Sequence, residues 1–279
     1  MWPILESDQP DATVGVPTAM RARSVTYSAQ HNAVVHRCTI DEMPILAAAL
    51  GDSPETVIAH HLLTTGACNA WVVGDVRQPR AAIVQAHQFL AEPMVFGDAA
   101  EPITRIIPQV DDWTTFCVPA VFARALERPV AMARNTLSLN TLEDVYHVLD
   151  GPLAPAERHP DVRLLTADDA ALLEGMPVDA SADGNTIVAA AIIEGEIVSL
   201  AHTFAWSPRY VDIGVTTHEE WRGQGLATSA AALVAEAIQA RGRVPVWSTG
   251  AHNEPSLRIA AKLGFRETSR KVYLIPQTE

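Results

Sequence analysis

The clearest chemical signal in the sequence is a short glycine-rich stretch, RGQGLA, at residues 222–227. It follows a strand-like run, YVDIGVTT, and opens a run that otherwise looks like one uninterrupted helix. Glycine costs roughly 1 kcal/mol against alanine inside a helix, so Gly223 and Gly225 indicate that something approaches the backbone closely. The N–H groups of a helix's first turn lack partners within the helix and carry positive potential. The arrangement therefore predicts a binding site for an anion such as a phosphate.

Two common phosphate-binding motifs do not fit this turn. A P-loop requires GxxxxGK followed by Ser or Thr, and the turn has no lysine. A dinucleotide site requires GxGxxG, but Thr228 occupies the third position, and the following strand-like run PVWSTG ends without an acidic residue. Nucleoside triphosphate hydrolysis is therefore disfavoured, and a dehydrogenase is only a third-ranked interpretation.

The turn and its surroundings resemble the GNAT superfamily of acyl-CoA-dependent N-acyltransferases. RGQGLA matches the family's R-x-x-G-x-A signature, DIGVTTHEEW resembles its cofactor-binding strand, and NEPSLRIAAKLGF at 253–265 resembles its asparagine-to-Gly-Phe segment. The resemblance covers about residues 161–276 and is greatest to the branch in which a further domain precedes the acetyltransferase domain. It implies an α/β fold with a GNAT-like mixed central sheet flanked by helices, and acetyl-CoA as the acyl donor.

The resemblance also implies which residues bind the cofactor. The backbone around Val215 and Thr217 would pair with the pantetheine arm as if with another strand. Asn253 and Ser256 would hydrogen-bond the pantetheine arm from the far side, although Asn253 can equally be the N-cap of the helix that follows. Main-chain N–H groups of the turn would bind the pyrophosphate, from Arg222, Gly223, Gln224, Gly225, Leu226 and Ala227.

Acyl transfer to an amine needs a base, because an alkyl ammonium must lose a proton before it can attack. Asp212 is predicted to be this base. Period-two alternation places it on the opposite face of its strand from Val211 and Ile213, whose side chains should pack on the helices. The alternative is an aspartate that only hydrogen-bonds a neighbouring strand.

The general acid is harder to assign, because Ala260 occupies the position at which many members of the family carry a tyrosine. Ser256, Tyr273 or a water molecule then remain as candidates. His202 lies in a predicted strand and is interpreted as structural, and Cys117 has no recognisable histidine partner.

No metal site is expected from the usual motifs. HEE at 218–220 lacks the second histidine of HExxH, and His60 and His61 are adjacent rather than one helical turn apart. The three cysteines show no CxxC spacing, and their odd number argues against a disulfide framework and favours a reducing compartment, the cytoplasm.

The composition narrows the choice of partners. The chain of 279 residues has 33 acidic and 20 basic residues, a formal charge of −13, so nucleic acid and anionic membrane surfaces would repel it. The charge either serves solubility alone or attracts a cationic substrate. No export signal is visible, and the apolar runs are shorter than the ~18 residues of a membrane helix.

A proline-rich segment, LDGPLAPAERHPDVR at 149–163, divides the chain. We therefore expect an N-terminal α/β domain at 1–150, a linker at 151–162 and a GNAT domain at 163–279. Before the linker, the expected order of strands and helices nearly repeats the order after it, including a strand over VAMARNTLSL, but without the glycine turn. This is either a degenerate GNAT-like repeat or the chance alternation found in any α/β protein.

The expected function is transfer of an acetyl group from acetyl-CoA to a primary amine of an unidentified, small and conceivably cationic molecule. A protein that senses acyl-CoA without turning it over is the alternative. Only PVDASADG separates Met176 from Asn185, too short for the second helix that commonly walls the family's acceptor cleft. Residues before 150 are therefore expected to complete that wall. The sequence makes no prediction of the oligomeric state.

Overall fold

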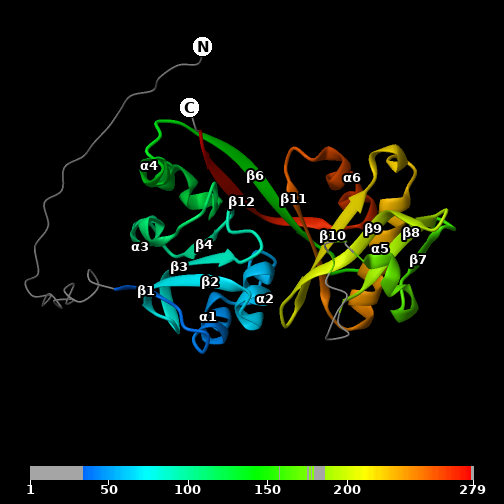
Figure 1. The fold of residues 1–279 in the computed structure, drawn as a ribbon, viewed down its shortest axis with the longest axis horizontal. Helices are drawn as coiled ribbons and strands as arrows, with labels where there is room; N and C mark the ends of the chain where they lie inside the picture. The colour runs from blue at the N-terminus through cyan, green and yellow to red at the C-terminus, as the bar shows by residue number, and fades with distance from the viewer. Residues whose placement is uncertain (1–33, 157, 175, 177, 179–185, 278–279) are drawn as a thin grey trace, which may run out of the picture. The chain divides into compact units, whose positions relative to one another are not determined.

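The computed structural model describes residues 34–156, 158–174, 176, 178 and 186–277. In these residues, twelve strands form one mixed sheet in the order β1-β2-β3-β4-β5-β12-β6-β11-β10-β9-β8-β7 (Figure 1). We call residues 34–148 the N-terminal half and residues 162–276 the C-terminal half. The segment between Met176 and Asn185 lies almost entirely outside the described residues.

The N-terminal half contributes six strands and four α-helices among its described residues. Two short 3-10 helices, η1 and η2, precede β5 and α4. In chain order the elements are β1 (Val35–Arg37), α1 (Met43–Leu50), α2 (Val57–Thr65), β2 (Cys68–Asp75), β3 (Gln78–Ala86), β4 (Met94–Gly97), α3 (Ala100–Ile106), η1 (Ile107–Gln109), β5 (Phe116–Pro119), η2 (Ala120–Phe122), α4 (Ala123–Ala133) and β6 (Leu139–Val148).

The described part of the C-terminal half contributes six strands and two α-helices. Its β8–β9 hairpin turns at Glu194 and Gly195, which both have positive φ, as a two-residue type I′ turn requires. In chain order the elements are β7 (Val162–Leu164), the 3-10 helix η3 (Ala167–Leu173), β8 (Val188–Ile193), β9 (Glu196–Trp206), β10 (Tyr210–Thr217), the 3-10 helix η4 (Glu219–Trp221), α5 (Leu226–Ala240), β11 (Val244–Gly250), α6 (Glu254–Leu263) and β12 (Arg266–Pro276).

One expected strand is wrong. VAMARNTLSL at 130–139 was expected to be extended, but its first residues complete α4, and β6 starts only at Leu139. Leu126 and Val130 are both fully buried and lie one helical turn apart, so Val130 belongs to the apolar stripe of the helix. The helix expected near Ala167 is a 3-10 helix, η3.

The strand order follows the same pattern when it is counted from either edge of the sheet. From either edge, five strands of one half follow in chain order, and the sixth strand comes from the other half: β12 follows β5, and β6 follows β11. The parallel pairs also correspond, because β4 with β5 and β10 with β11 run parallel. Such agreement in order and direction shows that the chain contains a structural repeat, not a chance alternation of elements.

The two halves meet at the exchanged strands. Antiparallel β6 and β12 pair along their lengths, from Arg266 opposite Val148 to Pro276 opposite Leu139 (Figure 1). By their contacts, Val34–Glu279 form one unit. The division expected at residues 151–162 falls between β6 and β7 and stays a prediction.

Different elements cover the two faces of the C-terminal part of the sheet. On one face, α5 and α6 pack on β9, β10 and β11 around a core that includes Val211, Ile213 and Leu226. On the other face, α2 of the N-terminal half contacts β9 and β10, and Val57 packs with Ala205 and Val246. An element from before residue 150 therefore covers this face, as expected; its influence on acceptor choice stays a prediction.

A polar contact fixes α2 near its partner strands. Asp52, in the loop before α2, accepts hydrogen bonds from Ser207 Oγ at 2.5 Å and from the backbone N–H of Arg209 at 2.8 Å. Both donors lie in the turn between β9 and β10. Because Asp52 is about 155 residues away in sequence, its carboxylate links two distant parts of the chain.

Replacing Asp52 with Ala should lower the free energy of unfolding by about 1 kcal/mol, since it removes two hydrogen bonds to an exposed carboxylate. Chemical denaturation measures this. In a double-mutant cycle, Asp52→Ala and Ser207→Ala should together cost less than the sum of the single changes. Additive costs would show that the hydrogen bond between the Asp52 and Ser207 side chains contributes nothing to stability.

Candidate functional site

The glycine turn is open and holds an unusual backbone conformation. Gly223 and Gly225 have φ of 80° and 85°, a region that residues with a side chain rarely adopt. A Cβ built on either residue would meet no atom within 4 Å. The backbone of the turn therefore faces free space.

The turn leads into a helix whose first N–H groups are open. Gly225 is the N-cap of α5 and supplies no side-chain hydrogen bond. Its carbonyl accepts the N–H of Ser229 at 3.0 Å. Among the described residues, no hydrogen bond satisfies the N–H groups of Leu226 and Ala227, and Arg222 beside them is exposed. Open donors at a fifteen-residue helix form a ready anion site.

The strand before this turn, β10, separates from its neighbour in the sheet, β11. Parallel pairing of β10 with β11 runs from Tyr210 opposite Val244 to Asp212 opposite Val246 and ends there, although both strands continue. On its other edge β10 stays paired with β9, through Val215 opposite Ala201 and Thr217 opposite Ser199. The edge of β10 that faces β11 thus has free backbone groups beyond Asp212, as strand-like pairing with a ligand requires.

Asn253 and Ser256 lie at the start of α6, after β11. Asn253 Oδ1 accepts the N–H of Ser256 at 3.3 Å, so the N-cap interpretation is confirmed. Ser256 Oγ accepts a hydrogen bond from Trp247 Nε1 at 3.0 Å. The amide nitrogen of Asn253 remains free to donate to a ligand, so the cap and the expected cofactor contact are compatible.

Asp212 occupies the last paired position before the strands separate. Its side chain is only 4% exposed, and Ser248 Oγ donates a hydrogen bond to its Oδ1 at 3.3 Å. Val211 and Ile213 lie in the core beneath α5, so Asp212 points to the other face, as alternation predicted. Burial, and to a smaller extent the charge of nearby Asp144, raises the pKa of the Asp212 carboxyl to about 8, although the hydrogen bond from Ser248 lowers it.

A row of buried and partly buried polar side chains continues from Asp212 across the exchanged strands. Ser248 of β11 lies opposite Tyr146 of β6, and Asp144 of β6 lies opposite Lys271 of β12. Burial raises the pKa of Asp144 to about 6, although the charge of Lys271 opposes this. It also raises the pKa of Tyr146, which is fully buried. Sequence reasoning missed Tyr146 because β6 was not expected; the alternation in LEDVYHV was its only signal.

The other candidate residues take less central places. Ala260 is fully buried in the core beneath α5 and α6. Tyr273 lies opposite Cys117 of β5, and burial raises the pKa of its hydroxyl. His202 is partly buried with a lowered pKa, and its ring lies against Gly214, where a Cβ would come within 2.8 Å of Nε2. This tight packing supports the structural interpretation of His202.

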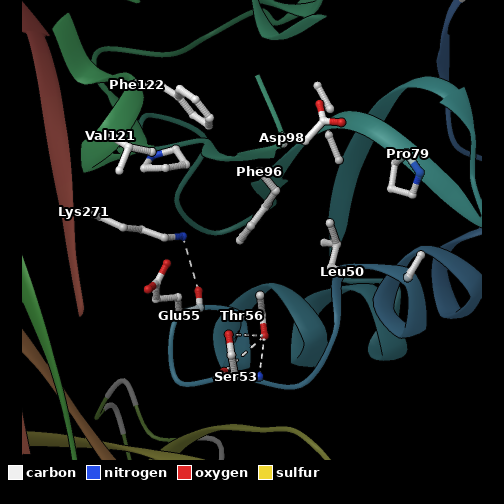
Figure 2. A pocket seen from close by; sticks show the side chains of 15 residues that line it. Leu50, Ser53, Glu55, Thr56, Pro79, Phe96, Asp98, Val121, Phe122 and Lys271 are labelled. Carbon is white, nitrogen blue, oxygen red and sulfur yellow. Dashed lines mark hydrogen bonds between the residues drawn. The ribbon is translucent and has the colours of Figure 1, made fainter. Parts of the chain in front are cut away.

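The N-terminal half has a pocket of about 500 Å³ near the ends of β4 and β5. Figure 2 shows Lys271 reaching toward Phe96, with its ammonium donating to the Glu55 carbonyl at 3.3 Å. The helix that follows β4, α3, has only seven residues, with Glu101 and Pro102 in its first turn. An acidic side chain and a residue without an N–H make this turn unsuited to a pyrophosphate.

A family model described as GNAT acetyltransferase matches residues 185–273. The resemblance to the GNAT superfamily is thereby confirmed for the C-terminal region. The match contains the glycine turn, Asp212, Asn253 and Ser256. No curated protein matches the chain.

Solved structures resemble the chain in fold across both halves. A GCN5-related N-acetyltransferase-like protein from Streptococcus suis has 20% identity and a TM-score of 0.57, covering 85% of this chain and 99% of its own. A Drosophila protein has 15% identity and a TM-score of 0.61, covering 88% and 99%. A tandem GNAT protein from the clavulanic acid biosynthesis pathway has 14% identity and a TM-score of 0.54, covering 86% and 98%. At these identities the likeness establishes a GNAT-like fold that includes the N-terminal half.

Within the described residues, no helix has both the length and the apolar character needed to cross a membrane.

The raised pKa of Asp212 predicts a pH-dependent stability. Between the ordinary aspartate pKa of 3.8 and about 8, the native state binds a proton that the unfolded state has lost, so stability should fall as pH rises through this window. Asp212→Asn keeps the acceptor for Ser248 and cannot ionise. Denaturation across this range should therefore show a flatter pH profile than that of the wild type.

The exposed Asp111 provides a control, because Asp111→Asn should reproduce the wild-type profile. Identical slopes for wild type and Asp212→Asn would mean that the buried carboxyl does not hold its proton.

Proposed function

We propose that the protein is an N-acetyltransferase that transfers the acetyl group of acetyl-CoA to a primary amine of a small molecule. The observation that carries this proposal is the open glycine turn at the uncapped start of α5, beside the point where β10 and β11 separate. The GNAT family match over the same residues supports acyl transfer as the reaction class.

The site offers one type of contact for each part of the cofactor. The N–H groups after Gly225 would bind the pyrophosphate, helped by the positive end of the helix dipole. The free edge of β10 around Val215 and Thr217 would pair with the amides of the pantetheine arm, and Asn253 would donate to it from the opposite side. These contacts would place the thioester between the separated strands, close to Asp212.

Asp212 would then act as the base. A carboxylate with an ordinary pKa is a poor acceptor for the proton of an ammonium, whereas a pKa of about 8 brings the two closer. The amine nitrogen would lose its proton to Asp212 and attack the thioester carbonyl, polarised by the N–H near Val215. Collapse of the intermediate releases the CoA thiolate, which must then be protonated.

The proposal extends to the charge of the acceptor, the location, the domains and the partners. A cationic acceptor is proposed from the charge of −13 and from the acidic side chains of Asp144 and Asp212 on the face that α2 covers. The cytoplasm is proposed as the location, consistent with three free cysteines. The division into domains at 1–150 and 163–279, and the absence of nucleic-acid and membrane partners, are retained as proposals.

The direct experiment incubates the protein with acetyl-CoA and a panel of amines, including polyamines, amino acids and aminoglycosides, and records free thiol. Amine-dependent thiol release confirms an acetyltransferase. If acetyl-CoA binds but no amine raises thiol release above hydrolysis, the non-catalytic sensor becomes the better interpretation. Binding of NAD(P) in place of acetyl-CoA would favour a dehydrogenase.

Gly225→Glu should abolish CoA binding, because a carboxylate would project from a strained backbone into the space required by the pyrophosphate. Calorimetry with CoA measures the loss. Gly242→Glu is a matched control, since Gly242 follows α5 with positive φ and open space around its Cβ. It should bind CoA like the wild type; equal CoA affinity in both variants would disprove this binding site.

Asp212→Asn should lower kcat by roughly 10²-fold or more while leaving the affinity for CoA nearly unchanged, because it removes the base and preserves shape. In the wild type, kcat should rise with pH up to about 8, as the carboxyl loses its proton. A variant with wild-type kcat from about pH 6 to 9 would show that Asp212 is structural.

A further inference from the structure

Three side chains with different donor atoms converge at the start of the described chain. His36 lies in β1, Cys38 follows it, and Glu42 directly precedes α1. The imidazole nitrogen, the thiol sulfur and a carboxylate oxygen all lie within 4.8 Å of one another. The spacing H-x-C-x-x-x-E is too short and too mixed to match the CxxC and HExxH motifs, so no zinc site was expected here.

Ordinary contacts explain only part of this cluster. Glu42 Oε2 accepts hydrogen bonds from the N–H of Thr39 at 2.9 Å and from its hydroxyl at 3.2 Å, as a helix-capping carboxylate does. This leaves Oε1, which lies 3.6 Å from His36 Nε2. Within the described residues, His36 Nε2 is buried and makes no hydrogen bond, with the Glu42 carboxylate only as an ion-pair neighbour. A buried ring nitrogen that lacks a hydrogen bond is costly unless something binds it.

The third donor is held in place by its backbone. Cys38 is 7% exposed, and its N–H donates to the carbonyl of Ala70 on β2 at 2.8 Å. The side chain thus lies at the border between the hydrophobic core under α1 and the partly exposed His36 and Glu42. Such a position protects a thiolate–metal bond from water while leaving a path for an ion to enter.

We propose that His36, Cys38 and Glu42 bind one zinc ion. One nitrogen, one sulfur and one carboxylate oxygen form a donor set that zinc accepts, whereas magnesium and calcium prefer oxygen alone. His36 would bind through neutral Nε2. The Cys38 thiol would lose its proton to solvent as the Zn–S bond forms, and a water molecule would complete the tetrahedron.

The geometry requires only a modest contraction. Zn–S and Zn–N bonds of about 2.3 and 2.0 Å place tetrahedral ligands roughly 3.3–3.8 Å apart. The distance between His36 Nε2 and Glu42 Oε1 already falls in this range. Cys38 Sγ lies within 4.8 Å of the other two donor atoms, so it would have to move closer to them as the metal binds.

The metal would stabilise a short edge strand of the N-terminal half. Among the described residues, β1 has three residues, forms an edge of the sheet and pairs only with β2. A zinc ion held by His36 from this strand and by Glu42 beside α1 would tie the edge to the helix. The proposed role is therefore structural and independent of acetyl transfer.

The test uses the full chain, stripped of metal by a chelator and titrated with cobalt(II) and zinc(II). We expect one cobalt per chain, with a thiolate-to-metal charge-transfer band in the near ultraviolet and visible bands typical of tetrahedral cobalt, all displaced by zinc. Cys38→Ser should abolish the charge-transfer band, and His36→Ala should weaken cobalt affinity at least about 10-fold. Cys117→Ser is the matched control, because it removes another buried thiol and should leave the band unchanged.

Zinc should also raise the melting temperature of the wild type and of Cys117→Ser, and have no such effect on Cys38→Ser. Circular dichroism identifies any variant that fails to fold; Glu42→Gln, which keeps a capping oxygen, then provides a milder test through lower cobalt affinity. Absence of the charge-transfer band in the folded wild type, or an equal band in Cys38→Ser, would overturn the proposal and leave Glu42 as a helix cap beside a histidine.

Discussion

The pairing of β6 with β12 is the interaction on which the rest of the structure depends. Each strand ends one half of the chain and completes the sheet of the other. Removing β12 would leave β5 with an unpaired edge, and removing β6 would leave β11 with one. Each parallel pair would then lose the antiparallel strand beside it. The exchange also brings residues far apart in sequence to one face, including Lys271 of β12 and Tyr146 of β6. A GNAT-like C-terminal half cut from this chain would therefore lack an inner strand of its sheet.

Both halves repeat the same frame, but their ligand-binding potential differs. In each, a parallel pair of strands stays joined for only a short distance, and a helix starts near the end of the first strand. After β10 this helix begins at an open glycine turn, and after β4 it begins with Glu101 in its first turn and Pro102. Local sequence at the helix start thus leaves an open backbone in one copy and an acidic, proline-containing first turn in the other, even though the fold is the same.

The exchanged strands also create an unusual electrostatic environment. Lys271 is fully buried, with its ammonium 4.2 Å from the Phe96 ring centre and 6.0 Å from that of Tyr146. Asp144 and Asp212 lie in the same region and have pKa values raised by burial to about 6 and about 8. Burying charges is costly, so the acids shift toward their neutral forms. This supplies the physical basis for a carboxyl group that changes its charge near neutral pH.

Much of the C-terminal half followed from local sequence. The turn RGQGLA, the hairpin at Glu194 and the capped helix after Asn253 each depend on a few neighbouring residues whose backbone preferences are strong. Alternation likewise placed Asp212 opposite the helix-packed face. The order of strands and helices, a local property, suggested a repeat but left chance alternation open. The boundary between α4 and β6 was missed because a stretch with the periodicity of a helix is followed by one with the alternation of a strand.

What the sequence determined by itself is the open backbone of the glycine turn and the type of most elements. Tertiary structure alone decided that β6 and β12 change places, that α2 covers the face to which Asp212 points, and that this carboxyl is buried enough for its pKa to rise. The physical reason is range: backbone preferences act over a few residues, whereas strand pairing and desolvation depend on contacts between residues more than a hundred positions apart.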